Sequence, residues 1–114
     1  MDETLRPHER IRKRKDFFRI YKKGSRFRGK YFVLVYLSNE LQFSRMAVVA
    51  SKKIGNAVVR NRVKRRMRTL YRTHKDKLPE AHDLVFITKR DIRNASWKEI
   101  RSECIEALES TQHL

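Results

Sequence analysis

The sequence predicts a single α+β domain, a two-layer sandwich in which helices pack against a small sheet. A chain of 114 residues has the length of one domain. A hydrophobic content of 39% is enough for one compact core. Segments with the period of a helix alternate with short runs of β-branched and aromatic residues, in the order helix, strands, helix, strand, helix. We expect a basic N-terminal arm over residues 1–12 and the folded domain over residues 13–114.

The first helical pattern covers residues 13–23. Phe17, Ile20 and Tyr21 share one face of this helix, and Phe18 is turned by about 100° from Phe17. We expect Phe18 and Ile20 to lie in the core. Phe17 and Tyr21 have two interpretations, core packing or an accessible aromatic surface, because a four-residue spacing suits both.

Three segments have the composition of strands. Residues 31–37 and 45–50 are rich in β-branched, aromatic and other apolar side chains, with a turn at 38–40, and predict an antiparallel hairpin. A short strand can form within the basic turn at residues 25–30. Residues 83–88 predict another long strand.

Two further helices are predicted over residues 56–73 and 96–110. Asn56 is a suitable N-cap for the first, and Ser96 with Glu99 forms a capping box that opens the second. Each helix has an apolar stripe that we expect to face the core. The stripes are Val59, Val63, Met67, Leu70 and Tyr71 in the first helix, and Trp97, Ile100, Cys104 and Leu108 in the second.

Positive charge is the outlying property of the composition. The formal net charge is +16, and residues 1–75 carry 23 Lys and Arg against 5 Asp and Glu. Such a charge favours a polyanion as partner, a nucleic acid more than an anionic membrane surface. A single cysteine excludes an internal disulfide, and the histidines lack metal-ligand spacing. No apolar run reaches the length of a membrane span, so we expect a cytoplasmic protein with no membrane partner.

Residues 51–75 contain ten Lys and Arg and no acidic residue. Like charges four residues apart on a helix, such as Lys64 and Arg68, cost about 0.2–0.5 kcal/mol per pair. RNA would offset this cost, because phosphates attract the cations and Arg can donate two parallel hydrogen bonds to one phosphate. The alternatives are a solvated basic face and an amphipathic helix for a calmodulin-type partner or a membrane surface.

The same stretch resembles the signature of bacterial ribonuclease P proteins. Residues 51–68 read SKKIGNAVVRNRVKRRMR, with the family's Lys-Lys, Ala, Arg-Asn-Arg, aliphatic, Lys-Arg and further Arg. Residues 10–17, RIRKRKDF, followed by Tyr21 and Gly24, are similar to the family's first helix. The resemblance extends through residues 32–34 and Lys89-Arg90, and covers residues 10–110.

The resemblance implies a left-handed crossover between two parallel strands and a ribonucleoprotein that removes the 5′ leader of precursor tRNA. In that family the RNA subunit is catalytic and binds most of the Mg²⁺. The protein contributes no catalytic residue and no metal site of its own. It binds the catalytic RNA and the leader in the bacterial cytoplasm, and outside the ribonucleoprotein it is expected to be monomeric.

Two binding surfaces follow from the resemblance. The surface for the catalytic RNA comprises Arg60, Asn61, Arg62, Lys64, Arg65 and Arg68. The cleft for the single-stranded leader comprises Phe17, Tyr21, Ser51, Lys52, Lys53, Lys89 and Arg90. Some family members have a Tyr facing this cleft where this chain has Val35, which removes one stacking partner.

Composition leaves a second class of function open. A structural RNA-binding protein of the ribosomal type would have the same charge, and only the signature separates the two. A protein nuclease is disfavoured, because five acids in the first 75 residues provide no convincing two-metal site. A helix-turn-helix DNA reader is disfavoured, because the basic helix follows a strand.

Overall fold

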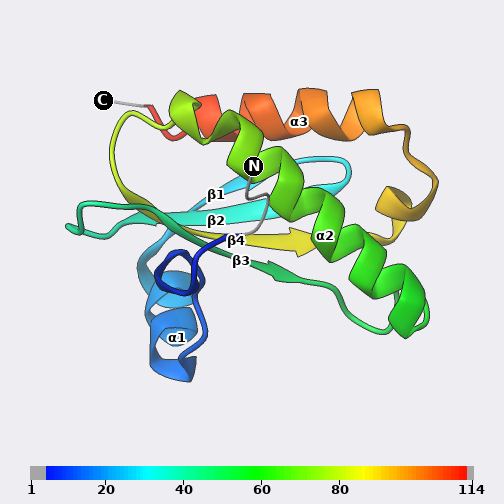
Figure 1. Ribbon diagram of the computed structural model, residues 1–114, viewed down its shortest axis with the longest axis horizontal. Helices are drawn as coiled ribbons and strands as arrows, with labels where there is room; N and C mark the ends of the chain where they lie inside the picture. Colours follow the sequence, from blue (N-terminus) through cyan, green and yellow to red (C-terminus); the bar gives the residue numbers. More distant parts are fainter. Residues whose placement is uncertain (1–4, 113–114) are drawn as a thin grey trace.

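A computed structural model describes residues 5–112, which form an α+β domain (Figure 1). The main elements are α1 (Arg14–Lys23), β1 (Ser25–Arg28), β2 (Phe32–Ser38), β3 (Arg45–Val49), α2 (Ala57–His74), β4 (His82–Thr88) and α3 (Trp97–Glu109). Three short 3-10 helices are η1 (Pro7–Glu9), η2 (Lys75–Lys77) and η3 (Arg90–Asn94). The predicted class and order of elements are confirmed, with a short β1 inside the basic turn.

The four strands form one sheet in the order β1-β2-β4-β3. β2 pairs antiparallel with β1 and β4, whereas β3 pairs parallel with β4. The predicted hairpin of β2 and β3 is therefore wrong, because β4 lies between them. Burial explains the arrangement: β4 is apolar on both faces and buried at six of seven positions, which suits a central strand, while most of β3 is only half-buried.

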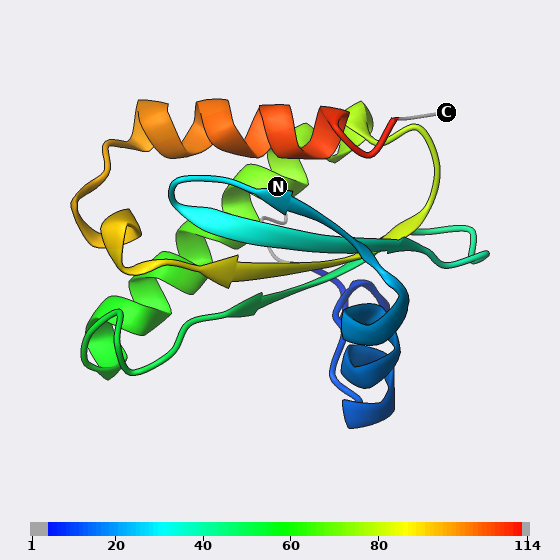
Figure 2. The same cartoon turned by 180° about the vertical axis from the view of Figure 1, so that it is seen from behind.

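The connection from β3 through α2 to β4 is left-handed. With both strands pointing upward and α2 toward the viewer, β4 lies to the left of β3 (Figures 1 and 2). About 98% of such crossovers in proteins are right-handed. This topology is the one that the resemblance implied, and it places α2 across the same face of the sheet as α3.

The main core lies between the sheet and the layer of α2 and α3. Phe86 contacts both Phe32 and Tyr71 edge to face, with ring centroids 5.4 and 6.4 Å apart. The predicted apolar stripe of α2 is confirmed, with Val59 half-buried and the other members buried. On α3, Ile100, Cys104 and Leu108 are buried as predicted.

Trp97 does not join this core. Its side chain is 40% exposed, so the predicted core position is wrong. Trp97 is the first residue of α3, at the end of this helix that follows η3. The centre of its ring lies 5.8 Å from the guanidinium of Arg66.

α1 packs on the opposite face and covers only one end of it (Figure 2). Ile20 is fully buried against Val35 and Val85, as predicted. Phe18 is 68% exposed, so its predicted core position is wrong. A helix that contacts the sheet along a single stripe buries the Ile20 side and leaves a residue turned well away from it in solvent.

The segment before α1 lies against the domain. Leu5 belongs to the main core, and Ile11 belongs to the smaller cluster under α1. The Ile11 amide donates to the Met46 carbonyl at 3.0 Å, beside a parallel bridge between Arg10 and Met46. Residues 5–12 of the predicted arm thus run along the edge of β3, and residues 1–4 lie outside the described part of the chain.

A buried carboxylate ties α1 to the sheet. Asp83, at the start of β4, has no exposed side-chain surface. Arg45 of β3 donates to both of its oxygens, at 2.9 and 2.7 Å, and Arg19 of α1 donates at 2.9 Å. Asn39 donates a further hydrogen bond at 3.0 Å, and Asp16 of α1 approaches Arg45 at 3.5 Å. This network fixes where α1 lies on the open face.

The Asp83→Asn variant should lower the free energy of unfolding by about 3–5 kcal/mol, because it removes the charge that compensates two partly buried arginines. Chemical denaturation measures the loss, and Asp76→Asn, in the exposed η2 turn, is the control. An equal effect of the two substitutions would contradict the role of the network.

The same variant has a defined pH dependence. Burial alone would raise the pKa of Asp83, but hydrogen bonds from Arg45, Asn39 and Arg19 outweigh it and hold the pKa below 3.8. A lowered carboxyl pKa contributes stability above the unfolded-state pKa, and this is lost as the pH falls through the folded-state value. The stability difference between wild type and Asp83→Asn should be greatest above about pH 4 and shrink in stronger acid.

Candidate RNA-binding surfaces

α2 begins where the chain leaves β3 through a tight turn. Gly55 has φ of 155°, a conformation that residues with side chains rarely adopt, and Asn56 follows as N-cap. The Asn56 side chain accepts a hydrogen bond from the Val59 amide at 3.0 Å, which confirms the predicted cap. Because the buried stripe fixes the rotation of α2, the polar side chains between its members must face outward.

The predicted RNA-docking residues of α2 lie in two groups. Asn61, Arg62 and Arg65 are exposed. Arg60, Lys64 and Arg68 are half-buried on the flanks of the helix. The Nε of Arg60 is buried without a hydrogen-bond partner among the described residues.

The N-terminal segment brings a further cation, Arg10, close to the basic residues of α2. Burial lowers the pKa of Arg68, and the nearby charges of Arg10 and Arg65 lower it further. Arg10 therefore lies close to α2, although the sequence placed it in an arm. The alternation of charged and apolar side chains at Arg10, Ile11 and Arg12 was the available signal, since it is the pattern of an edge strand with one side buried.

A groove at the edge of β3 connects α2 with α1. Phe17, one of the predicted leader-cleft residues, lines this groove together with Lys64 and Arg68 of the predicted RNA-docking set. The remaining lining residues are Arg10, Ile11, Arg12, Met46, Ala47 and Val48. The two surfaces predicted separately from the sequence therefore meet along this edge.

The two aromatic residues of the predicted cleft lie where α1 packs on the open face of the sheet. Phe17 and Tyr21 are both half-buried, with ring centroids 6.2 Å apart. They pack against a small cluster whose half-buried members continue across the sheet as Val33, Ala47, Val49 and Ile87. Each ring thus contacts the core and keeps an accessible part. Val35 is fully buried and contributes no accessible surface.

The basic end of the cleft lies where β3 and β4 end. Ser51, Lys53, Lys89 and Arg90 line one hollow, together with Ile54 and Thr88. Lys52 is exposed beside it and does not line it. The Lys89 ammonium donates to the Gly29 carbonyl at 2.6 Å, which holds this cation at the rim. Lys89 follows Val85, which lies under α1, by four positions, which is about 13 Å of extended chain.

Several acidic residues near these surfaces are engaged elsewhere. Glu9 pairs with Lys75 at 2.9 Å, and Asp16 and Asp83 belong to the network under α1. Glu103 accepts hydrogen bonds from the amides of residues 30–32. Within residues 5–112 no ion pair involves the five cations of the predicted RNA-docking set, Arg60, Arg62, Lys64, Arg65 and Arg68. Their charge is available to an external anion.

An α+β domain with a strongly cationic helix on one face and aromatic and basic side chains on the other defines a nucleic-acid-binding protein. The sequence profile of the family described as Ribonuclease P matches residues 5–112. The ribonuclease P protein component of Syntrophus aciditrophicus is 40% identical over 100 residues, covering 88% of this chain and 84% of that protein. That of Alkaliphilus metalliredigens is 34% identical over 104 residues, covering 91% and 94%.

Solved structures agree with this relationship. The RNase P protein of Staphylococcus aureus superposes with a TM-score of 0.82 at 33% identity, covering 91% of this chain and 95% of that one. The RNase P protein of Thermotoga maritima superposes with a TM-score of 0.84 at 29% identity, covering 92% and 99%. The chain belongs to the bacterial ribonuclease P protein family and is a protein subunit of the enzyme that matures the 5′ end of tRNA. The ribosomal-type alternative is not favoured.

Proposed function

We propose that the outward face of α2 docks on the catalytic RNA of ribonuclease P, and that the cleft between α1 and the sheet receives the 5′ leader of precursor tRNA. The groove that Phe17 shares with Lys64 and Arg68 carries this proposal. It brings the cleft and the basic helix to one edge of the domain, so a leader in the cleft lies beside the RNA on α2.

The composition of each surface fits its proposed ligand. Contacted phosphates release condensed counterions, which favours the cations of α2 against a folded RNA. Unpaired bases stack on aromatic rings with little sequence preference, which suits Phe17 and Tyr21. Phosphates of the same strand can then reach Ser51, Lys53 and Arg90 at the far end of the cleft.

The chemistry belongs to the RNA subunit in this proposal. It supplies the Mg²⁺-dependent hydrolysis of one phosphodiester, and the protein, monomeric outside the ribonucleoprotein, holds the leader in place in the bacterial cytoplasm. Among the described residues no three His, Cys, Asp or Glu side chains gather in one place. None of the helices between residues 5 and 112 is long and apolar enough to cross a membrane.

The isolated protein should leave precursor tRNA uncut at any Mg²⁺ concentration. Addition of the cognate ribonuclease P RNA should give efficient cleavage at the mature 5′ end at near-physiological salt. Gel analysis of end-labelled precursor measures both reactions. Cleavage at that position by protein freed of RNA and of contaminating nucleases would refute the assignment of catalysis to the RNA.

Phe17→Ala and Tyr21→Ala should each weaken holoenzyme binding to leader-bearing precursor tRNA by about 1–3 kcal/mol, the range for the loss of one aromatic–base stack. Mature tRNA has no leader, so its affinity should change little. Equilibrium binding of the two RNAs measures the difference.

Phe18→Ala is the matched control, because this ring lies on the same helix but is exposed outside the cleft. It should leave the affinity for both RNAs near wild type. If Phe17→Ala and Tyr21→Ala weaken both RNAs equally and also lower the unfolding temperature, the rings serve the core and not the leader.

A further inference from the structure

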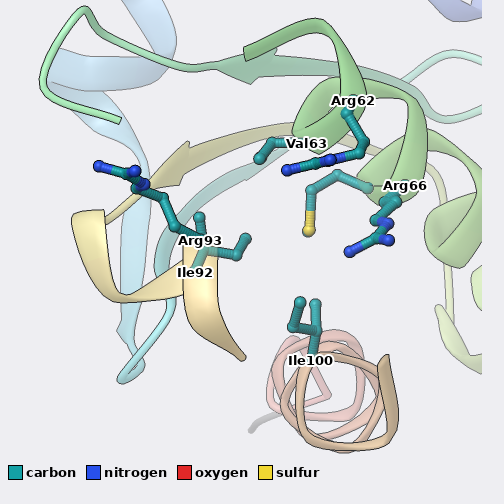
Figure 3. Close-up of a pocket in the computed structure, with 7 residues that line it drawn as sticks. Arg62, Val63, Arg66, Ile92, Arg93 and Ile100 are labelled. Carbon is teal, nitrogen blue, oxygen red and sulfur yellow. The ribbon is translucent and has the colours of Figure 1, made fainter. Parts of the chain in front are cut away.

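Three arginines surround a small apolar pit between α2, η3 and α3 (Figure 3). Arg62 and Arg66 extend from α2, and Arg93 projects from η3 on the other side of the pit. The floor consists of Val63, Met67, Ile92 and Ile100. The signature of α2 accounts for Arg62. It does not account for Arg66, and Arg93 comes from a different part of the chain.

These arginines lack anionic partners within the protein. In the described part of the chain, none of the three forms an ion pair or donates a hydrogen bond to a carboxylate. Glu99, on the neighbouring α3, is occupied by the Ser96 amide and the Tyr31 hydroxyl, at 3.0 and 2.8 Å. Repulsion among unpaired arginines opposes folding, so an external anion is needed to make the cluster favourable.

Trp97 contacts one of these arginines, Arg66. The Arg66 guanidinium lies 5.8 Å from the centre of the Trp97 ring, within the range of a cation–π interaction. Trp97 keeps 40% of its surface exposed and contributes little to the core. A large aromatic residue in this position restrains the side chain of Arg66, which lowers the entropy lost when the guanidinium binds a ligand.

The size of the pit indicates which part of an RNA it can meet. The enclosed space is about 10 Å³, which is room for one water molecule and not for a base. Recognition must therefore take place at the rim, where guanidinium groups are presented. Arginine on a convex rim is suited to the phosphate oxygens of a nucleic-acid backbone.

The position of the cluster indicates which RNA it meets. Arg62 and Arg66 belong to α2, and the pit opens on the face of the sheet that α2 and α3 cover. The aromatic part of the leader cleft lies under α1 on the opposite face, and only its basic end reaches Arg90 at the start of η3. Because Arg62 and Arg66 belong to α2, an RNA that docks on α2 can continue across η3 to Arg93.

We propose that Arg66 and Arg93, together with Arg62, form a phosphate clamp for the backbone of the catalytic RNA, and that Trp97 is a positioning residue for Arg66. The clamp extends the docking surface from α2 to the start of α3. This inference rests on the proposed docking of α2 on that RNA.

The test is the affinity of the full-length protein for its cognate ribonuclease P RNA, without tRNA, over a series of monovalent salt concentrations. Arg66→Gln and Arg93→Gln should each reduce the slope of log K against log salt by about 0.7–0.9, the value for one lost phosphate contact. Lys77→Gln removes one charge beside the other end of α3 and should leave the slope unchanged.

The positioning role of Trp97 is tested by combining its substitution with that of Arg66. Trp97→Ala should weaken binding in the presence of Arg66 and have no further effect in the Arg66→Gln background, whereas Trp97→Phe should retain most of the affinity. Thermal unfolding of each variant separates these effects from a loss of fold. Additive effects of Trp97→Ala and Arg66→Gln would overturn the positioning role.

A triple variant separates a failure of the clamp from a failure of the proposed docking of α2. In this variant Arg60, Arg62 and Arg65 are all changed to Gln. A reduced slope in this variant, with wild-type slopes for Arg66→Gln and Arg93→Gln, would overturn the clamp and leave the docking of α2 intact. A wild-type slope in all of them would overturn both. A reduced affinity for the precursor leader, with unchanged binding to the catalytic RNA, would assign the clamp to the substrate and overturn the proposal.

Discussion

The buried carboxylate of Asp83 is the constraint on which the cleft depends. α1 has only ten residues and covers one end of the sheet, so few apolar contacts fix its position. Asp83 joins β4 to Arg45 of the edge strand and to Arg19 of α1 through hydrogen bonds of 2.7–2.9 Å. An apolar contact would allow α1 to slide along the sheet, but a charge shared by two arginines has one favourable geometry. Phe17 and Tyr21 are positioned as a consequence, with part of each ring in contact with the core and part facing the open sheet.

A second constraint is the positive charge of α2. The main core on one side of this helix is apolar and closely packed, while Arg60, Arg62, Lys64, Arg65 and Arg68 form no ion pair within residues 5–112. Packing therefore stabilises a helix whose own charges repel one another. The left-handed crossover places this helix on the face opposite α1. The two candidate RNA-binding surfaces thus face two sides of one small domain and meet along the groove at β3.

The helices and their caps could be predicted because their signals are local. Asn56, Ser96 and the apolar stripes act within a few residues of chain, and the structure confirms them. The pairing of β2 with β4 could not be predicted in the same way, because a turn between two strand-like segments favours a hairpin and only the burial of both faces of β4 places it centrally. Phe18 was assigned to the core as an aromatic residue and Trp97 by its place on the helical stripe, but both are exposed. Helical spacing does not tell how far along a helix the contact with the sheet extends. The roles of Asp83 and of the Arg66–Trp97 pair depend on contacts between distant segments, for which the sequence has no local signal.

The central claim, that the two faces of the domain meet two different RNA strands, is tested most directly by site-specific crosslinking. The native thiol of Cys104 is buried and its pKa is raised to about 12, so a cysteine added on the surface can be labelled selectively with a photo-crosslinker. In the holoenzyme bound to precursor tRNA, a probe at Asn61→Cys on α2 should crosslink to the catalytic RNA, and a probe at Ser51→Cys in the cleft should crosslink to the leader. Crosslinking of both probes to the same RNA, or of the α2 probe to the leader, would contradict the account.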